Sequence, residues 1–159
     1  MDAFTLFLLV FAIGVVAGLR SMTAPAAVSW AAHLNRVHLD ATGLAFFGYT
    51  ATAYILTALA LAELAGDKLP STPSRKAPGP FTVRVILGGL CGAALCLSVS
   101  EPVMAGAVIG ALGGVAGTLG GYEARTRIVK SLQVRDAVIA VAEDLVAVGG
   151  AFLIVSRFV

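Results

Sequence analysis

Four acidic residues are the side chains of this sequence most able to do chemistry. Glu143 and Asp144 lie inside the apolar run AVIAVAEDLVAVGGAFLIVS, and Glu63 and Asp67 lie at the end of another apolar stretch. An unpartnered charge inside a bilayer costs about 2.5–3.5 kcal/mol on insertion scales. These acids therefore need protein, water, a proton or a cation beside them, and such residues are typical of ion and proton pathways.

The four acids are expected at a similar depth. Glu143 lies about 10 Å beyond Asp136 along a helix, and Glu63 lies about 6 Å before Asp67, at 1.5 Å per residue. Two basic residues accompany them at this level. We predict one ion, proton or solute site from six residues: Glu63, Asp67, Glu143, Asp144, Lys68 and Arg84. Two interpretations are open, an inward-facing polar vestibule that handles a cation or proton, and a structural network of ion pairs.

The motif GLRSMTAP forms a second candidate site. Arg20 ends the first apolar run, and Ser21 and Thr23 precede a proline that suits the first turn of a helix. A helix N-terminus offers free N–H groups and a positive partial charge. We interpret this motif as a candidate anion site, with Thr23 as the N-cap. The alternative is an interfacial arginine beside an ordinary helix cap.

No pattern of catalytic or metal-binding residues is visible. The sequence lacks G-x-S-x-G, H-E-x-x-H and a P-loop. His33 and His38 are five apart, and Cys91 and Cys96 have no further ligand nearby, so neither pair predicts a metal site. We expect no catalytic residues, no metal and no other cofactor, and we rank a membrane enzyme third among the functions considered.

The composition indicates a chain that is embedded in a bilayer. Hydrophobic residues make up 58% of the 159 residues and charged residues 13%, against roughly 25% charged in soluble domains. The mean hydropathy is +0.94. A soluble protein of this size has too much surface for so few charges. No basic, aromatic-interleaved face is present, so we exclude nucleic acid as a partner.

The elements that must position these residues are apolar segments near the length of a bilayer crossing. We predict an all-α, polytopic membrane helix bundle, a single integral membrane domain over residues 1–159. About five transmembrane helices are expected, together with one short interfacial or re-entrant helix over 24–34. The five expected spans cover residues 3–19, 41–65, 83–100, 103–122 and 137–156.

The distribution of Lys and Arg predicts the orientation. The loops over 66–84 and 123–136 carry eight basic residues, against three elsewhere in the chain. Because basic loops stay in the cytoplasm, we expect both loops to be cytoplasmic in a cell-membrane protein. With five spans the N-terminus is inside and the C-terminus outside. If the 24–34 segment also crosses, the same loops stay inside and the N-terminus moves out.

Glycines recur at helix spacing in three of the expected spans. Gly14 and Gly18 form one G-x-x-x-G, Gly88 and Gly92 form another, and the span over 103–122 carries two glycine stripes. Small residues let helix backbones approach closely in lipid. Tight packing is the favoured interpretation, and a glycine-lined pore is the alternative. Because so small a bundle encloses little volume, we also expect a homodimer with glycine stripes at its seam.

The motifs GLRSMTAP and ELAGDKLPSTPSR, with the late acidic pair in the last span, resemble a known family. It is a family of small bacterial integral membrane proteins named domain of unknown function 4126. The resemblance covers nearly the whole chain and supports the architecture and the site positions, but it implies no substrate. The matching positions are Gly18, Arg20, Pro25, Glu63, Asp67, Lys68, Pro70, Pro73, Glu143 and Asp144.

These observations lead to a ranked set of functions. The leading prediction is a transporter or channel-like protein for a small solute or ion, with an inward-facing acidic site. The alternative is a non-transporting membrane module, either a lipid-head-group binder or an accessory subunit, whose basic loops contact anionic lipid. The expected partners are the lipid bilayer and a small solute or ion.

Overall fold

The computed structural model describes residues 1–40, 42–66, 77–132 and 136–158, and the side chains of 132, 136 and 137 are left out of the description. Over this part of the chain the protein is all-helical, as predicted, with six α-helices, one short 3-10 helix and no strand. The elements are α1 (Ala3–Leu19), α2 (Thr23–His33), η1 (Ala45–Gly48), α3 (Thr50–Gly66), α4 (Pro78–Ser98), α5 (Val103–Leu132) and α6 (Asp136–Val155).

Local sequence explains where the first and fourth helices begin. Asp2 is the N-cap of α1 and accepts hydrogen bonds from the N–H and the hydroxyl of Thr5. These two bonds hold the pKa of the Asp2 carboxyl below its usual value. Helix α4 begins at Pro78, where the missing N–H of proline is no loss because a first-turn N–H has no helical partner.

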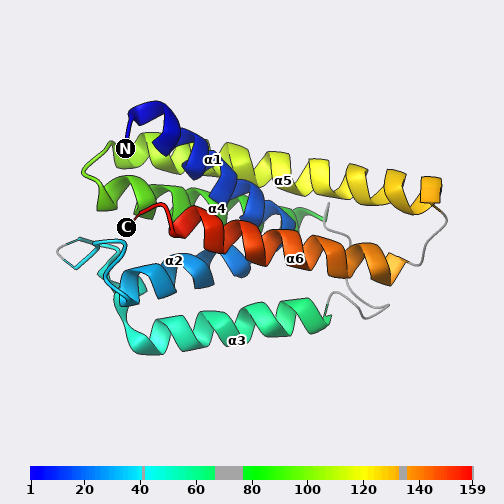
Figure 1. Ribbon diagram of the computed structural model, residues 1–159, viewed down its shortest axis with the longest axis horizontal. Helices are drawn as coiled ribbons and strands as arrows, with labels where there is room; N and C mark the ends of the chain where they lie inside the picture. The colour runs from blue at the N-terminus through cyan, green and yellow to red at the C-terminus, as the bar shows by residue number, and fades with distance from the viewer. Residues whose placement is uncertain (41, 67–76, 133–135, 159) are drawn as a thin grey trace.

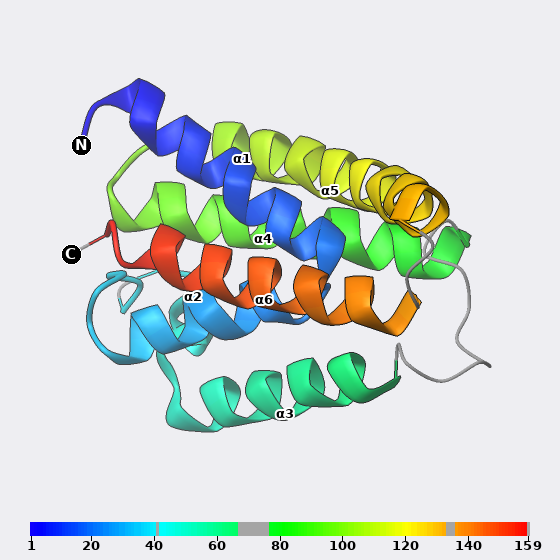
Figure 2. The same ribbon diagram turned by 45° about the vertical axis from the view of Figure 1, so that its right-hand side comes forward.

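Consecutive helices alternate in direction, so the bundle has two distinct ends (Figures 1 and 2). Helices α1, α4 and α5 lie together, α6 lies beside α1 and α2, and α3 packs on the far side of α2. Both chain termini lie at one end. The last turns of α3 and α5 and the first turns of α4 and α6 lie at the other end.

The observed helices match the predicted segments with three differences. The 41–65 segment is divided into η1 and α3, α4 begins five residues earlier than expected, and α5 continues without a break to Leu132. Within the described ranges three helices, α4, α5 and α6, are long and apolar enough to cross a membrane. Helices α1 and α3 are also apolar but shorter, with 17 residues each. The expected count of about five spans is therefore not confirmed.

The short helix predicted over 24–34 is α2, and it enters the bundle instead of lying across its end. It runs antiparallel to α1 and returns the chain to the end where the N-terminus lies (Figure 1). Its 11 residues span only about 16 Å. The turn between α1 and α2 consequently lies inside the bundle. The termini thus share one end, as in the six-segment alternative and unlike the five-segment topology.

Glycines bring the backbones of α1, α4 and α5 into direct contact. A Cβ added at Gly88 would lie 2.7 Å from the carbonyl oxygen of Gly110, and one at Gly114 would lie 2.9 Å from that of Arg84. Gly14 and Gly18 face α5 in the same way. The predicted glycine stripes therefore serve packing within the chain. Since these stripes are already covered, they are not available as the seam of a homodimer.

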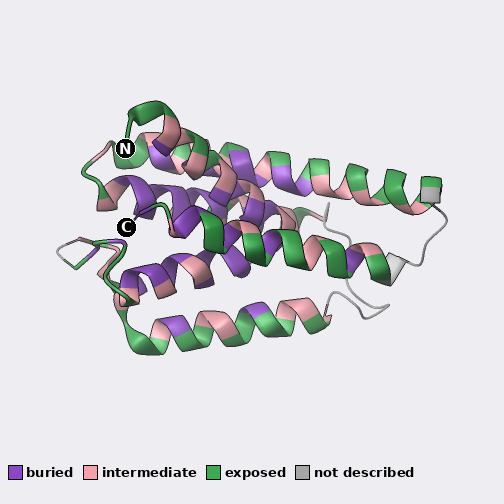
Figure 3. Cartoon of the chain, viewed as in Figure 1, coloured by how far each residue is buried: buried purple, intermediate pink, exposed green. Residues whose placement is uncertain are grey.

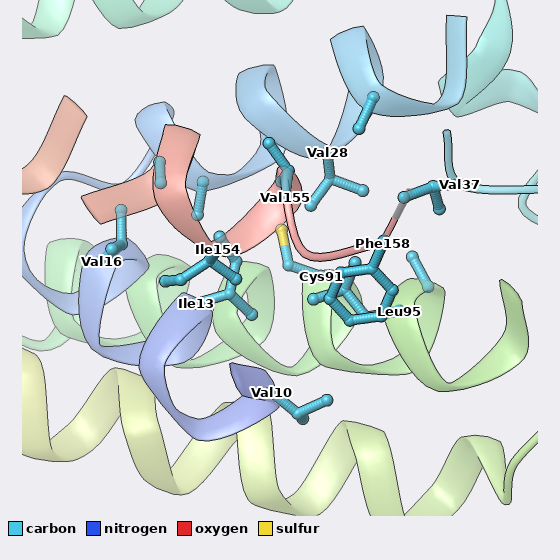
Figure 4. Close-up of a cluster of buried hydrophobic side chains, with 14 of the residues drawn as sticks. Val10, Ile13, Val16, Val28, Val37, Cys91, Leu95, Ile154, Val155 and Phe158 are labelled. Carbon is cyan, nitrogen blue, oxygen red and sulfur yellow. The ribbon is translucent and has the colours of Figure 1, made fainter. Parts of the chain in front are cut away.

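The apolar core lies where α1, α2, α4 and α6 meet (Figures 3 and 4). Figure 4 shows Val10 and Ile13 of α1 beside Leu95 of α4 and Phe158 after α6. Large apolar side chains also cover the outer surface, among them Phe152, which is 70% exposed. An apolar surface outside an apolar core is the pattern of a helix bundle that is solvated by lipid.

Replacing a packed glycine should destabilise the bundle although alanine is the better helix former. Gly110→Ala places a Cβ against the backbone of Gly88, which has no side chain that could move away, and should cost about 1–3 kcal/mol of unfolding free energy. Gly149→Ala is the matched control because a Cβ there meets nothing within 4 Å. It should be neutral or stabilise by up to about 1 kcal/mol.

Reversible unfolding of purified protein in mixed micelles measures both variants. Equal effects of the two substitutions would contradict the backbone contact between α4 and α5.

Candidate functional site

The turn between α1 and α2 is the point at which charged residues from most of the bundle meet. Helix α1 ends at Leu19, and Arg20 takes an extended conformation while its N–H still bonds the carbonyl of Val16. We call this turn and its side-chain partners the charged hub. The hub consists of Gly18, Arg20, Ser21, Met22, Glu63, Arg84, Thr118 and Asp144.

Arg20 is the most deeply buried charge of the hub. Its residue exposure is 0%, and its guanidinium forms an ion pair with the carboxylate of Asp144 from α6. The Asp144 side chain is 13% exposed. An arginine stays charged at any physiological pH. The pair therefore neutralises a permanent positive charge inside the apolar bundle.

Glu63 of α3 bonds the start of α2. Its carboxylate accepts hydrogen bonds of 2.8 Å from the N–H groups of Ser21 and Met22, and a third of 2.8 Å from the Ser21 hydroxyl. The first N–H groups of a helix have no partner within the helix and attract negative charge. Glu63 thus does from a distant helix what an N-cap side chain usually does. This corrects the predicted cap, because α2 begins at Thr23 and its N-cap, Met22, makes no side-chain cap bond.

Arg84 and Thr118 satisfy the other side of the turn. Arg84 of α4 donates to the carbonyl oxygen of Gly18 at 3.1 Å and lies 3.4 Å from the Glu63 carboxylate. The Thr118 hydroxyl of α5 lies 3.2 Å from the same Gly18 oxygen. The Thr118 hydroxyl also lies 2.8 Å from the carbonyl oxygen of Gly114, so its one proton is shared between the two carbonyls. The end of α1 therefore meets the Arg84 guanidinium, while the start of α2 meets an acid. The hub pairs two basic residues with two acids.

The structure joins the two predicted sites and divides the acidic one. Arg20 and Ser21 of the candidate anion site contact Asp144 and Glu63, respectively. Glu143 instead lies 3.6 Å from Arg125 of α5, in a separate ion pair. Asp67 and Lys68 lie outside the described residues, so their part in the predicted site is not located.

A groove between α2, α3 and α6 was not predicted from the sequence. It encloses about 570 Å³ and is lined mostly by apolar side chains, such as Ala60 and Leu64 of α3 and Val148 and Phe152 of α6. Its polar lining residues are Thr23, Arg36, Thr57 and Ser156. We call it the lateral groove. The small residues Ala26, Ala27 and Ala31 on α2 lower its floor. This alanine spacing was the one sequence signal for the groove, but it does not distinguish a groove from close helix packing.

Thr23 connects the lateral groove with the charged hub. It follows the hub residue Met22, lines the groove and is 6% exposed. Among the described residues its hydroxyl has no hydrogen-bond partner. Further along the groove, Trp30 donates to the hydroxyl of Thr57 at 2.8 Å and so ties α2 to α3. The predicted anion site included Thr23, and the structure places this residue in the mostly apolar lining of the groove.

The two histidines lie at the end of α2 and just after it. His33 lies 3.2 Å from the carbonyl oxygen of Gly48, and His38 is exposed at the surface. Over the described ranges no three His, Cys, Asp or Glu side chains are grouped closely enough to hold a metal ion. What the arrangement offers chemically is a desolvated charge network beside an apolar groove.

The fold and the hub together define a class, an all-α bundle of apolar, membrane-type helices with a charged centre. Within that class the chain belongs to the family named domain of unknown function (DUF4126), which it matches over residues 7–157. This confirms the resemblance seen in the sequence. No curated protein and no solved structure shows significant similarity to the chain.

Removing one partner of the buried pair should destabilise the protein far more than removing a surface charge. Arg20→Met leaves Asp144 without its counter-charge and should cost about 3–5 kcal/mol, whereas the double variant Arg20→Met with Asp144→Leu should recover most of the loss. Arg127→Met is the control, since Arg127 pairs with Glu123 at the exposed surface, and it should cost about 0.5 kcal/mol or less.

The measurement is the unfolding free energy, in micelles, of the wild type, Arg20→Met, the double variant and Arg127→Met. A double variant as unstable as Arg20→Met would show that the loss does not come from leaving the Asp144 charge unpaired, and would contradict the prediction.

Proposed function

We propose that the protein is a small membrane transporter or channel-like protein whose charged hub handles a proton or a small ion during transport. The observation that carries the proposal is the ion pair between Arg20, which is fully buried, and Asp144. Replacing a buried ion pair by apolar side chains of similar volume is often neutral or stabilising. Stability alone therefore does not account for such a pair, and inside membranes charges of this kind are typical of transport pathways.

The hub has groups that a transport cycle can use. Protonation of Asp144, or competition by a cation, would release the Arg20 guanidinium. Release of Arg20 would loosen α6 from the turn between α1 and α2. The Glu63 carboxylate holds the same turn from α3 through three hydrogen bonds. A proton or ion at the hub would in this way couple to the relative position of α3 and α6.

The proposal includes an orientation in the membrane and an oligomeric state. We place the bundle across the cell membrane with the connections after α3 and α5 in the cytoplasm, because those regions carry most of the basic residues. The pair of Glu143 with Arg125 then lies toward the cytoplasmic end and forms the entrance to the hub. A homodimer stays part of the proposal, with a seam other than the packed glycine stripes.

The length of α5 favours a second candidate, a module that binds anionic lipid head groups without transport. Its 30 residues span about 45 Å, which exceeds a hydrocarbon core of about 30 Å. The last turns, with Arg125, Arg127 and Lys130, would thus reach the head-group region. Each basic residue near an anionic membrane surface contributes about 1 kcal/mol of attraction.

Flux into proteoliposomes tests the transport proposal. The wild type is assayed with H⁺, Na⁺, K⁺ and small anions at several pH values, beside Asp144→Asn, Glu143→Gln and the control Glu123→Gln. We expect a selective flux that Asp144→Asn lowers at least tenfold and whose pH dependence disappears in that variant. Glu143→Gln should lower the rate less, and Glu123→Gln should leave it unchanged because Glu123 is half-exposed.

Two outcomes of the flux assay would reject the transport proposal, and a vesicle-binding result would favour the lipid-binding module. Absence of flux for every ion, or the same flux in wild type and folded Asp144→Asn, rejects a transporting role for the hub. Binding to anionic vesicles that is lost when Arg125, Arg127 and Lys130 are neutralised, with no flux in the wild type, would favour the lipid-binding module.

A further inference from the structure

The lateral groove runs from the interior of the bundle to one of its ends. Its deep end lies at Thr23, beside the charged hub, and its other end lies past Trp30 at Arg36. Helices α2 and α6 both run toward the end of the bundle that holds the chain termini (Figure 1). Arg36, which follows α2, and Ser156, which follows α6, therefore mark the outer end of the groove.

Arg36 is the polar lining residue that remains able to meet a ligand. The Thr57 hydroxyl is bonded to Trp30 and to a backbone carbonyl, and the Ser156 hydroxyl donates to another carbonyl. The Thr23 hydroxyl is enclosed by protein atoms. Arg36 is exposed, and within the part of the chain that the structure describes its guanidinium forms no ion pair.

The charge at the outer end of the groove is positive. A second arginine, Arg157, directly follows the lining residue Ser156 and is exposed. The acids described at this end of the bundle are Asp2, Asp40 and Glu101, and none of them lines the groove. An anionic group at the outer end is therefore attracted, and a cationic group is repelled. A neutral group would gain nothing from the arginine charge.

The length of the groove matches one leaflet of a bilayer. Its α2 side extends from Thr23 to Leu34, which is about 16 Å at 1.5 Å per residue. Half of a hydrocarbon core is about 15 Å. Leu61 of α3 and Phe152 of α6 are 61% and 70% exposed, so the groove is open on its side. An acyl chain can enter from the lipid and lie along the whole groove, with its head group at the outer end.

The volume of the groove argues against a helix as its occupant. A helix about 10 Å wide and 16 Å long fills roughly 1,250 Å³, more than twice the volume of about 570 Å³ that the groove encloses. A helix from a second copy of the chain would rest on α3 and α6 and leave a void above the alanines of α2, which close-packed proteins avoid. A flexible hydrocarbon chain can reach this floor.

We propose that the lateral groove binds one anionic phospholipid of the bilayer, with an acyl chain along α2 and the phosphate at Arg36. Arg36 is the specificity-determining residue, because it selects the charge of the head group. The site differs from the lipid-binding module, which would hold anionic lipid at the last turns of α5, at the opposite end of the bundle. It goes beyond the transport proposal and does not require it, since a protein that selects this lipid but moves no ion keeps the site.

Fluorescence of Trp30 tests the site, because Trp30 is the one tryptophan of the sequence and it lines the groove. The purified full chain is reconstituted in vesicles of equal parts phosphatidylcholine and phosphatidylglycerol. Bromine atoms, which quench tryptophan on contact, are placed high in the acyl chains of one lipid or of the other, so the composition and the surface charge of the vesicles stay constant. We expect brominated phosphatidylglycerol to occupy the quenching site about fivefold more strongly than brominated phosphatidylcholine, which is the effect of one basic residue near an anionic head group.

Variants of two arginines make the test specific. Arg36→Gln removes the charge and should bring the ratio of the two lipid affinities to about one, whereas Arg36→Lys should keep most of the preference. Arg127→Gln is the matched control, because Arg127 is an exposed arginine at the opposite end of the bundle. It should leave the ratio unchanged. Both positions are exposed, so these variants should fold.

A variant of the floor tests whether the lipid lies in the groove. Ala27→Phe fills the groove from α2 and should lower the quenching of Trp30 by both brominated lipids. If Ala27→Phe does not accumulate as folded protein, the comparison of Arg36→Gln with Arg36→Lys decides the question alone.

Four results would overturn the proposal. Equal quenching of the wild type by the two brominated lipids would mean that the groove holds unselective bilayer lipid. Absence of quenching by both would mean that protein, such as a second copy of the chain, covers Trp30. A preference that survives in Arg36→Gln would assign the phosphate to another residue. Full quenching in folded Ala27→Phe would place the lipid outside the groove.

Discussion

A single arginine sets the main physical constraint on this fold. Arg20 is placed at the end of α1, inside the bundle, because α2 is too short to carry the turn to the surface. A guanidinium does not lose its charge on burial, as a lysine or a histidine can. The fold must therefore bring an acid to it, and α6 supplies Asp144. The surrounding contacts satisfy the backbone groups that the same turn leaves open, since no water is available inside a bilayer to do so.

The hub also determines how α3 is held. Helix α3 packs mainly on α2 and η1, and only Ala53 and Ala60 are buried along its length. Its apolar contacts with the rest of the bundle are therefore few. Polar contacts compensate for this, because Glu63 bonds the start of α2 and Thr57 bonds Trp30. The lateral groove is a result of this arrangement, since α3 and α6 stand on opposite sides of α2, which contributes the small residues Ala26, Ala27 and Ala31 to the lining between them.

The bounds of the helices could be predicted from the sequence better than which helices pack against each other. Hydropathy placed α1 within a residue of its observed bounds and α6 within about one residue, because in lipid an apolar run and a helix nearly coincide. The start of α4 was predicted too late, at residue 83, because the Pro-rich stretch before it was assigned to the loop, whereas Pro78 fits the first turn. The basic end of α5 carries no breaker, and the helix simply continues through it.

The site was predicted residue by residue, but its connections were not. Glu63, Asp144 and Arg20 each stood out as charges in apolar surroundings, yet the pairing of Arg20 with Asp144 depends on whether α2 turns back into the bundle. Hydropathy cannot decide this for a segment of 11 residues. The unsatisfied hydroxyl of Thr23 was still less visible, because the sequence alone suggests that a threonine before Pro25 caps its helix.

The backbone contacts among α1, α4 and α5 have a mechanical consequence. Where a glycine Cα rests on a carbonyl oxygen, as Gly113 of α5 does against Phe11 of α1, no layer of side chains remains that could rotate and let the helices slide. These three helices form a rigid frame. The two helices outside this frame that the hub holds by side chains are α3, through Glu63, and α6, through Asp144, so a change in the hub acts on these two helices and not on the frame.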